Sequence, residues 1–142
     1  MRVLPSNVIL LLAACNVFIG TAQAEQSAEL GNGRWYSTAD IQHGREVFGA
    51  NCAICHGAQA QGATVGSLTA PPLNGSGHSA HHGLSYLLEQ ITNGGASKGG
   101  KMPAFGAVLN ESERRAAIAW VQSLWPDEAY RNWQRMHQDG DH

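Results

Sequence analysis

Residues 51–57, "NCAICHG", place two thiols and one imidazole within a few positions of each other. Cys52 and Cys55 have the spacing C-x-x-C, and His56 follows directly. This motif is typical of a covalently attached haem, but a bare C-x-x-C can also be half of a zinc site or a redox pair of thiols. The three chemistries need different partner residues, so the rest of the chain decides between them.

A zinc site would need two further ligands besides the cysteines. Two of the three histidines in "HSAHH", His78, His81 and His82, could complete a Cys2His2 set. This interpretation gives no role to His56 or to the glycine-rich segment around Met102. A thioredoxin-like redox pair would require a βαβ pattern, which the sequence does not contain. Both interpretations explain fewer residues than a haem does.

A haem would use all three side chains of the motif. Its vinyl groups would take up the two thiols, and His56 would bind the iron from one side. Met102 is the best candidate for the second axial ligand, because Met1 precedes the mature chain and Met136 lies in a polar tail. In "GGKMPAFG" the glycines allow close approach to a flat ligand, and Pro103 stiffens the loop. The alternative is that Met102 only fills a gap in the core.

Residues 1–24 have the pattern of a secretory signal peptide. An arginine precedes an apolar run from Val8 to Ile19, and the small-x-small site "AQA" ends the segment. Because the run is shorter than the roughly 18 residues of a spanning helix, we expect cleavage and no membrane span afterwards. The predicted location is the periplasm or another compartment outside the cytoplasm. The alternative is a lipobox, "LAAC", which would leave Cys15 as a lipid anchor.

Length, charge and cysteine usage narrow the function classes. The chain of 142 residues suggests one domain, preceded by a polar lead-in at residues 25–37. A formal net charge of −2 gives no reason to expect nucleic acid or an anionic membrane surface as a partner. Without Cys15, the only possible disulfide would close the small ring between Cys52 and Cys55 and would connect no distant segments. Attachment of a cofactor explains these two cysteines better.

The hydrophobic pattern predicts an all-α domain. Helices are expected from about residue 38 to 52, from 84 to 93 and from 111 to 125. The segment Asn110-Glu111-Ser112-Glu113 resembles a capping box that opens the third of them. No alternating pattern of β-branched residues predicts a strand.

Loops are expected to make up much of the remaining domain. Residues 57–83 are rich in glycine, serine, proline and histidine, which predicts a long irregular loop. Such a loop is uncommon in a compact domain unless it has a function, and wrapping a cofactor is one. Residues 126–142 form an extension, in which we expect a short helix with Tyr130 and Trp133 packed back onto the domain.

Four segments together resemble a monohaem class I c-type cytochrome of the bacterial, exported kind: "GREVFGANCAICHG", "APPLNG", "GGKMPAF" and "AAIAWVQSLW". They occur in this order between about Ala39 and Trp125, so the resemblance covers a domain at residues 38–125. It implies the cytochrome c fold, in which the N- and C-terminal helices cross and long loops wrap around one covalent haem.

The resemblance also implies which residues form the helix crossing. In this family the first helix crosses the last through a glycine and an aromatic residue. Gly44 and Phe48 match the positions on the first helix, while Ala117 and Trp120 match the partner face.

Roles for the candidate site residues follow from the same resemblance. One haem c would be attached to Cys52 and Cys55, with His56 and Met102 as the axial ligands of its iron. The family uses a proline carbonyl to accept the free ring N–H of the axial histidine, and Pro71 best matches that position. The candidates for the apolar haem pocket are Ile54, Leu73, Leu84, Leu87, Leu88, Ile91 and Phe105.

These features predict a single-haem electron carrier that cycles between Fe(II) and Fe(III) and connects a redox protein donor with an acceptor. Two axial ligands leave no open iron position, so we expect no enzymatic turnover. One alternative is a haem enzyme or gas sensor with an open iron site. Another is a metal-binding accessory protein that uses His78, His81 and His82. Because Lys98 and Lys101 are the only lysines, docking is expected to depend little on charge.

Overall fold

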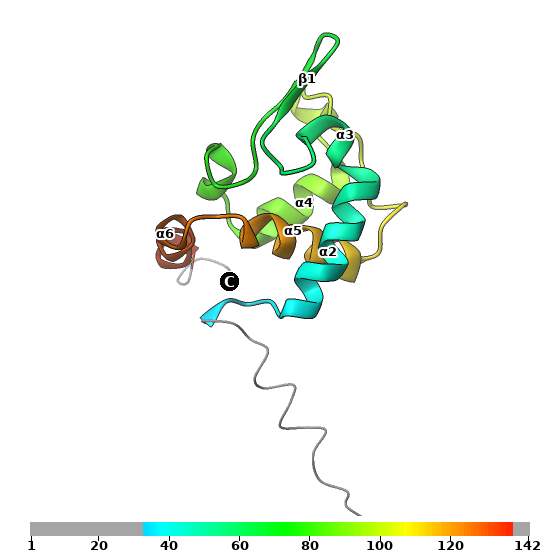
Figure 1. The fold of residues 1–142 in the computed structure, drawn as a ribbon. Helices are drawn as coiled ribbons and strands as arrows, with labels where there is room; N and C mark the ends of the chain where they lie inside the picture. The colour runs from blue at the N-terminus through cyan, green and yellow to red at the C-terminus, as the bar shows by residue number, and fades with distance from the viewer. Residues whose placement is uncertain (1–32, 138–142) are drawn as a thin grey trace, which may run out of the picture.

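Residues 33–137 of a computed structural model are described below (Figure 1). The expected signal peptide, Cys15 and most of the polar lead-in lie outside the described residues. The helices and strands, in chain order, are α2 (Thr38–Asn51), α3 (Ala53–His56), β1 (Ala63–Val65), β2 (Leu68–Ala70), η2 (His78–His81), α4 (Leu84–Asn93), η3 (Ala96–Lys98), α5 (Glu111–Ser123) and α6 (Asp127–His137). None of the helices in this range is long and apolar enough to cross a membrane.

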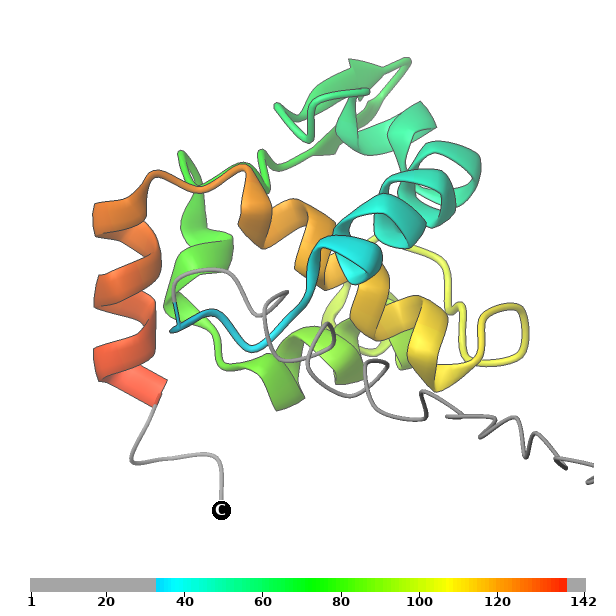
Figure 2. The ribbon, with the colours of Figure 1, turned by 60° about the horizontal axis from the view of Figure 1, so that its bottom comes forward.

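The crossing of α2 and α5 forms the centre of the molecule (Figure 2). Gly44 permits it, because a Cβ atom at this position would lie 1.9 Å from the carbonyl oxygen of Ala116. Beside this contact the rings of Phe48 and Trp120 pack with their centroids 4.4 Å apart. The predicted crossing is therefore present. The closest approach to the glycine is the backbone carbonyl of Ala116, and Ala117 packs with Val47 of α2 in a neighbouring cluster of buried residues.

Both long helices begin at capping boxes. The Ser37 hydroxyl accepts a hydrogen bond from the backbone N–H of Asp40, whose carboxylate accepts one from the Ser37 N–H. Asn110 and Glu113 form the same reciprocal pair at the start of α5. Each pair satisfies two backbone donors that a helix start leaves without intrahelical partners. The capping box predicted at residues 110–113 is confirmed, and α2 begins at residue 38 as expected.

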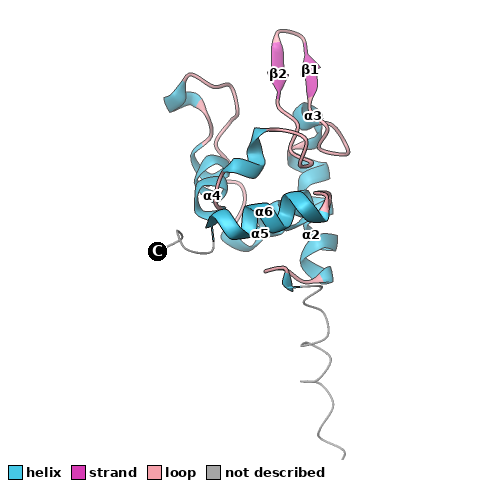
Figure 3. Ribbon diagram, turned by 90° about the vertical axis from the view of Figure 1, so that its left-hand side faces the viewer, coloured by secondary structure: helices cyan, strands magenta, loops and turns pink. Residues whose placement is uncertain are grey.

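A β-hairpin interrupts the predicted irregular loop, so the expectation of no strands was wrong. Strands β1 and β2 pair antiparallel, with Ala63 opposite Ala70 and Val65 opposite Leu68. The two-residue turn between them begins with Gly66, whose φ of 61° suits glycine. Each strand has only three residues, too few to establish an alternating pattern. The hairpin projects from the helical body (Figure 3).

Helix α6 packs against the same core as the rest of the domain, beside η2 (Figures 1 and 2). Tyr130 and Trp133 are buried, as expected from the sequence. At the start of the helix Asp127 forms an ion pair with Arg34 over 2.9 Å. The extension thus contributes aromatic surface to the core.

Candidate functional site

The C-x-x-C-H motif forms a single helical turn at the end of α2. The backbone N–H groups of Cys55 and His56 both donate to the carbonyl oxygen of Cys52, over 3.1 and 2.9 Å. Both cysteines are half-buried and neither is in a disulfide. One rigid turn therefore presents two free thiols and the imidazole that lies next to them.

The ring of His56 has a defined orientation and proton position. Its Nδ1 atom lies 3.1 Å from the carbonyl oxygen of Pro71, so the contact expected from the sequence is present. Because a carbonyl oxygen can only accept, Nδ1 must carry the proton, and the lone pair of the neutral ring is on Nε2. The side chain is buried, with 9% of its surface exposed. This arrangement provides a preoriented nitrogen ligand for a metal ion.

Backbone hydrogen bonds hold Pro71 in front of His56. The Gly62 N–H donates to the carbonyl oxygen of His56 over 2.8 Å, and the Leu73 N–H donates to that of Ala60 over 2.7 Å. Gly62 has a φ of 80°, and a Cβ atom there would lie 2.8 Å from the backbone nitrogen of Pro72, the residue that follows Pro71. The loop therefore folds tightly back on the motif.

Met102 lies in a loop that folds back onto the C-terminal end of α4. The Gly95 N–H donates to the carbonyl oxygen of Met102 over 2.9 Å, and the Phe105 N–H donates to that of Ile91 over 2.9 Å. At Gly94, with a φ of 69°, a Cβ atom would lie 2.6 Å from the same Met102 oxygen. Only glycine permits this approach without strain. The methionine thus has a constrained backbone.

The apolar side chains of α4 are only partly covered by the protein. This helix contains no buried residue, although four of its side chains form an apolar stripe. The stripe consists of Leu84, Leu87, Leu88 and Ile91. Of the other pocket candidates, Leu73 packs against the main core, Phe105 packs beside Val47, and Ile54 is 78% exposed on α3.

The donor set and its surroundings fit a c-type haem. Two free thiols would supply the attachment points of such a haem, and the imidazole and the thioether are ligands that cytochrome iron uses. The half-covered stripe of α4 offers the apolar surface that a porphyrin face needs. The pKa of the Cys52 thiol is raised to about 11, mainly by its burial and to a lesser extent by the nearby Cys55, so the thiol is protonated at neutral pH.

Comparison with known proteins identifies the family. The model of the family described as cytochrome C oxidase, cbb3-type, subunit III matches residues 39–121, which is more than half of the chain. The chain belongs to this family of c-type cytochromes. The matched range contains the C-x-x-C-H motif, Pro71 and Met102. As a c-type cytochrome, the protein binds haem.

Individual relatives agree with this assignment. A cytochrome c6 of Leptolyngbya boryana is 33% identical over 67% of this chain and 100% of the relative. A cytochrome c6 of Bumilleriopsis filiformis is 37% identical over 60% of this chain and 92% of the relative. The cbb3-type cytochrome c oxidase subunit CcoP of Azospirillum sp. (strain B510) is 33% identical over 66% of this chain, which spans only 31% of that subunit. No solved structure gives a significant match.

The histidines of "HSAHH" contact each other and an aromatic ring in this cytochrome. The rings of His78 and His81 stack with their centroids 4.9 Å apart, and His82 stacks on Tyr86 at 4.1 Å. Within residues 33–137, no group of three or more histidine, cysteine, aspartate or glutamate side chains is placed to hold a metal ion. The geometry therefore does not support the zinc site or the accessory metal site considered from the sequence.

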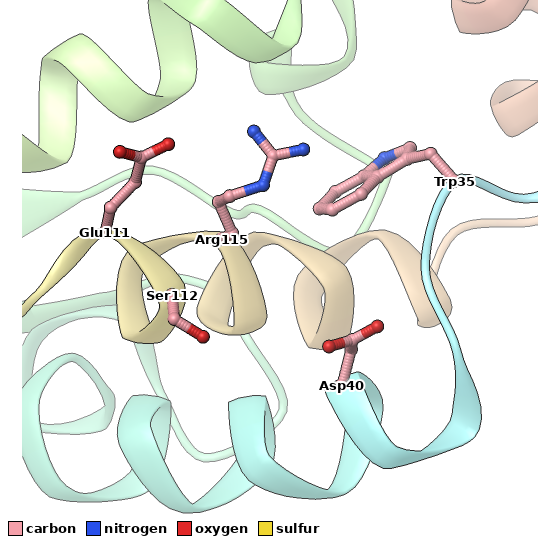
Figure 4. Close-up of a pocket in the computed structure, with 5 residues that line it drawn as sticks. All are labelled: Trp35, Asp40, Glu111, Ser112 and Arg115. Carbon is pink, nitrogen blue, oxygen red and sulfur yellow. The ribbon is translucent and has the colours of Figure 1, made fainter.

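A concavity of about 360 Å³ lies between the beginnings of α2 and α5 (Figure 4). The Arg115 guanidinium lies 5.1 Å from the ring centroid of Trp35, and Asp40, Glu111 and Ser112 complete the lining. None of the site residues predicted from the sequence lines this concavity. It is therefore separate from the haem site of the cytochrome.

Two residues that sequence reasoning missed support the site. Trp125 donates from Nε1 to the carbonyl oxygen of Leu73 over 2.7 Å and so fixes the loop that contains Pro71. Gln90 donates from Nε2 to the Met102 sulfur over 3.8 Å. The only sequence signal for Trp125 is a large aromatic residue at a helix end. Gln90 gives no signal of its own in the sequence.

Proposed function

We propose that this protein is an exported electron carrier with one haem c attached through Cys52 and Cys55. His56 and Met102 are the axial ligands of the iron in this proposal. The observation that carries it is the hydrogen bond from His56 to Pro71. In this bond Nδ1 is the donor, so the lone pair of Nε2 is available to bind iron. The haem supplies a one-electron couple between Fe(II) and Fe(III). The leader-like residues 1–24 support export.

In this proposal the protein binds and orients the haem and has no catalytic role. With both axial positions taken by side chains, no substrate reaches the iron. The ring of His56 is fixed by Pro71, and the backbone of Met102 is fixed by Gly95, so the ligands move little when the iron changes charge. A small structural change between the two oxidation states is what fast electron transfer requires. A carrier is thus favoured over a haem enzyme or a gas sensor.

Substitution of Met102 by alanine tests the proposal directly. We expect the wild-type ferric protein to show the weak far-red charge-transfer band of a haem with a methionine ligand, and Met102→Ala to lose it. The variant should also bind carbon monoxide in the reduced state and have a lower reduction potential, because a thioether ligand raises the potential. The measurements are oxidised and reduced absorption spectra and a redox titration.

Met136→Ala is the matched control, because this methionine is 51% exposed on α6 and should leave the band unchanged. A wild-type haem without the band would exclude Met102 as a ligand and favour an open or bis-histidine iron. Absence of any covalent haem would reject the whole proposal.

We further propose that redox partners dock on an uncharged face beside the haem attachment turn. The sequence from Val47 to Leu88 contains no aspartate, glutamate, lysine or arginine. Exposed apolar side chains lie within this stretch: Ile54 on α3 and Val65 and Leu68 on the hairpin, exposed by 78%, 46% and 42%. A partner of this face is a redox protein with an equally uncharged contact surface.

Electron self-exchange between two copies of the protein tests this docking mode without a known partner. We expect the self-exchange rate to change by less than about twofold from about 0.01 M to about 1 M salt, although the screening length falls tenfold. The rate is measured from NMR line widths in mixtures of oxidised and reduced protein. Ile54→Lys should slow exchange at low salt and make it salt-dependent, because like charges then meet. A steep salt dependence of the wild type would contradict the proposal.

A further inference from the structure

The histidines of residues 78–82 form a continuous cluster of rings at the surface. The ring of His78 stacks on that of His81, with centroids 4.9 Å apart, and meets that of His82 edge to face at 5.2 Å. His82 in turn stacks on Tyr86 at 4.1 Å. His78 and His81 are exposed, and His82 is half-buried. These three histidines, called the histidine patch, are therefore accessible to solvent and to a partner.

A lysine extends the histidine patch with a further positive charge. The Nζ atom of Lys98 lies 4.3 Å from the ring centroid of Tyr86 and 3.3 Å from the hydroxyl oxygen of that residue. Because His82 stacks on the same tyrosine, one ring connects the imidazoles with the ammonium group. Lys98 is exposed. The surface therefore has one cation even when every imidazole in it is neutral.

Within residues 33–137, no carboxylate pairs with the histidine patch. The sequence from Val47 to Leu88 contains no aspartate or glutamate. Glu89, the only carboxylate of α4, is exposed and forms no hydrogen bond or ion pair with these rings. On α6, which packs against η2, Asp127 is paired with Arg34, and Glu128 lies in the same first turn. The other charged or titratable side chains of α6, apart from Tyr130, are basic: Arg131, Arg135 and His137.

Protonation of the histidine patch therefore accumulates positive charge. Histidine is the side chain that changes its charge between about pH 5 and 8. The pKa of His82 is lowered, first by its burial and then by the nearby His78, His81, Lys98 and His137. All four of these neighbours are basic groups, so like charges resist each added proton. As the pH falls from neutral to about 5, the surface changes from weakly to strongly positive.

The histidine patch borders two segments of the haem site. His82 lies two residues before Leu84, which begins the apolar stripe of α4. Its carbonyl oxygen accepts a hydrogen bond from Nε1 of Trp133 over 2.8 Å, which fixes this segment. Lys98 lies four residues before Met102, in the loop that contains the expected iron ligand. Charge on this surface therefore acts on a partner that approaches from the side of α4 and the Met102 loop.

We propose that the histidine patch and Lys98 form a docking surface for a redox protein with an acidic contact surface, and that protonation of the patch engages it. This inference rests on the proposed function as an electron carrier. At neutral pH the imidazoles add little charge, so the uncharged contact beside the attachment turn dominates. At acidic pH the positive surface attracts carboxylates over a longer range and speeds association. The same charge repels a basic partner, so the pH selects between partners of opposite charge.

Two small oxidants of opposite charge test this surface without a known partner. The reduced holoprotein is mixed in a stopped-flow instrument with hexacyanoferrate(III), a trianion, or with tris(phenanthroline)cobalt(III), a trication. Each complex takes one electron from the Fe(II) haem, so the ratio of the two rate constants largely cancels any change in the haem potential. At about 0.01 M salt we expect the ratio of anion to cation rates to rise about tenfold from about pH 7.5 to about pH 5. The rise should disappear at about 1 M salt, where charges are screened.

Substitutions in the patch show whether its histidines cause this rise. His78→Gln combined with His81→Gln removes two exposed imidazoles and should reduce the rise to less than about threefold. His82→Gln is a second, independent variant that leaves both exposed histidines in place and should also reduce it. His43→Gln is the matched control, because His43 is exposed on α2 and contacts none of the patch rings. Lys98→Gln should lower the ratio at both pH values and leave the rise unchanged.

Failure of this inference and failure of the proposed function give different results. If the wild-type haem is oxidised by both complexes but the ratio does not depend on pH, the docking surface is overturned and the carrier remains. The same conclusion follows if the double variant shows the full rise, or if the rise persists at about 1 M salt, where the screening length is only about 3 Å. If the protein contains no covalent haem, neither oxidant reacts with it and both proposals fail.

Discussion

Replacing Gly44 with alanine is expected to destabilise the protein by about 3 kcal/mol, a large part of the stability of a small domain. The added Cβ atom would lie 1.9 Å from the carbonyl oxygen and 2.5 Å from the carbonyl carbon of Ala116, and 3.0 Å from the Cβ atom of Trp120. Two of these atoms belong to the backbone of α5, which cannot move aside as a flexible side chain can. The two helices would have to separate along their crossing, and the packing of Phe48 on Trp120 would weaken.

Gly49→Ala provides the control for this prediction. Gly49 lies in the same helix, and a Cβ atom there would meet no atom within 4 Å. Since alanine favours a helix over glycine by about 1 kcal/mol, this variant should be as stable as the wild type or slightly more stable. Both free energies of unfolding are measured by denaturant titration of the holoprotein. Equal small effects at the two positions would show that α2 and α5 do not cross at Gly44.

The helical framework could be predicted from the sequence because its signals are local. Helix α4 has its apolar side chains at helical spacing, and its predicted bounds, residues 84–93, agree with the structure. Each capping box is formed within a stretch of four residues, from Ser37 to Asp40 and from Asn110 to Glu113. The helix crossing was predicted through the family resemblance, and Gly44, Phe48, Ala117 and Trp120 all lie where α2 and α5 meet.

The parts that the sequence did not predict depend on very short elements or distant contacts. Three-residue strands are too short to show an alternating pattern, and Gly66 was one of many glycines in that loop. Trp125 and Leu73 are 52 positions apart, and Gln90 and Met102 are 12 apart. A hydrogen bond between such residues follows from the folded path of the chain, and no local pattern encodes it. The attachment motif, by contrast, could be found in the sequence because Cys52, Cys55 and His56 lie within five consecutive residues.

Helix α6 makes the extension part of the folded domain, and Trp133 is the residue through which this is best tested. Its side chain is buried, with 6% of its surface exposed. Its ring packs on those of Tyr130 and Trp125, with centroids 5.6 and 6.1 Å away. Its Nε1 atom donates to the carbonyl oxygen of His82 over 2.8 Å, which connects α6 to the segment just before α4. Removal of the indole would therefore leave both a cavity and a carbonyl oxygen without its donor.

Trp133→Ala is expected to lower the free energy of unfolding by about 4 kcal/mol, the usual cost of deleting a buried tryptophan. Trp133→Phe retains most of the ring and loses the hydrogen bond, so its cost should be about 1–2 kcal/mol. Met136→Ala on the same helix should cost less than about 0.5 kcal/mol, because that side chain is 51% exposed. Denaturant titrations give the three values, and the far-red band of the native protein reports whether the iron ligands are unchanged. If Trp133→Ala were no more destabilising than Met136→Ala, α6 would be a loosely attached tail. A loss of about 4 kcal/mol with an intact band would instead show that α6 stabilises the fold from outside the haem site.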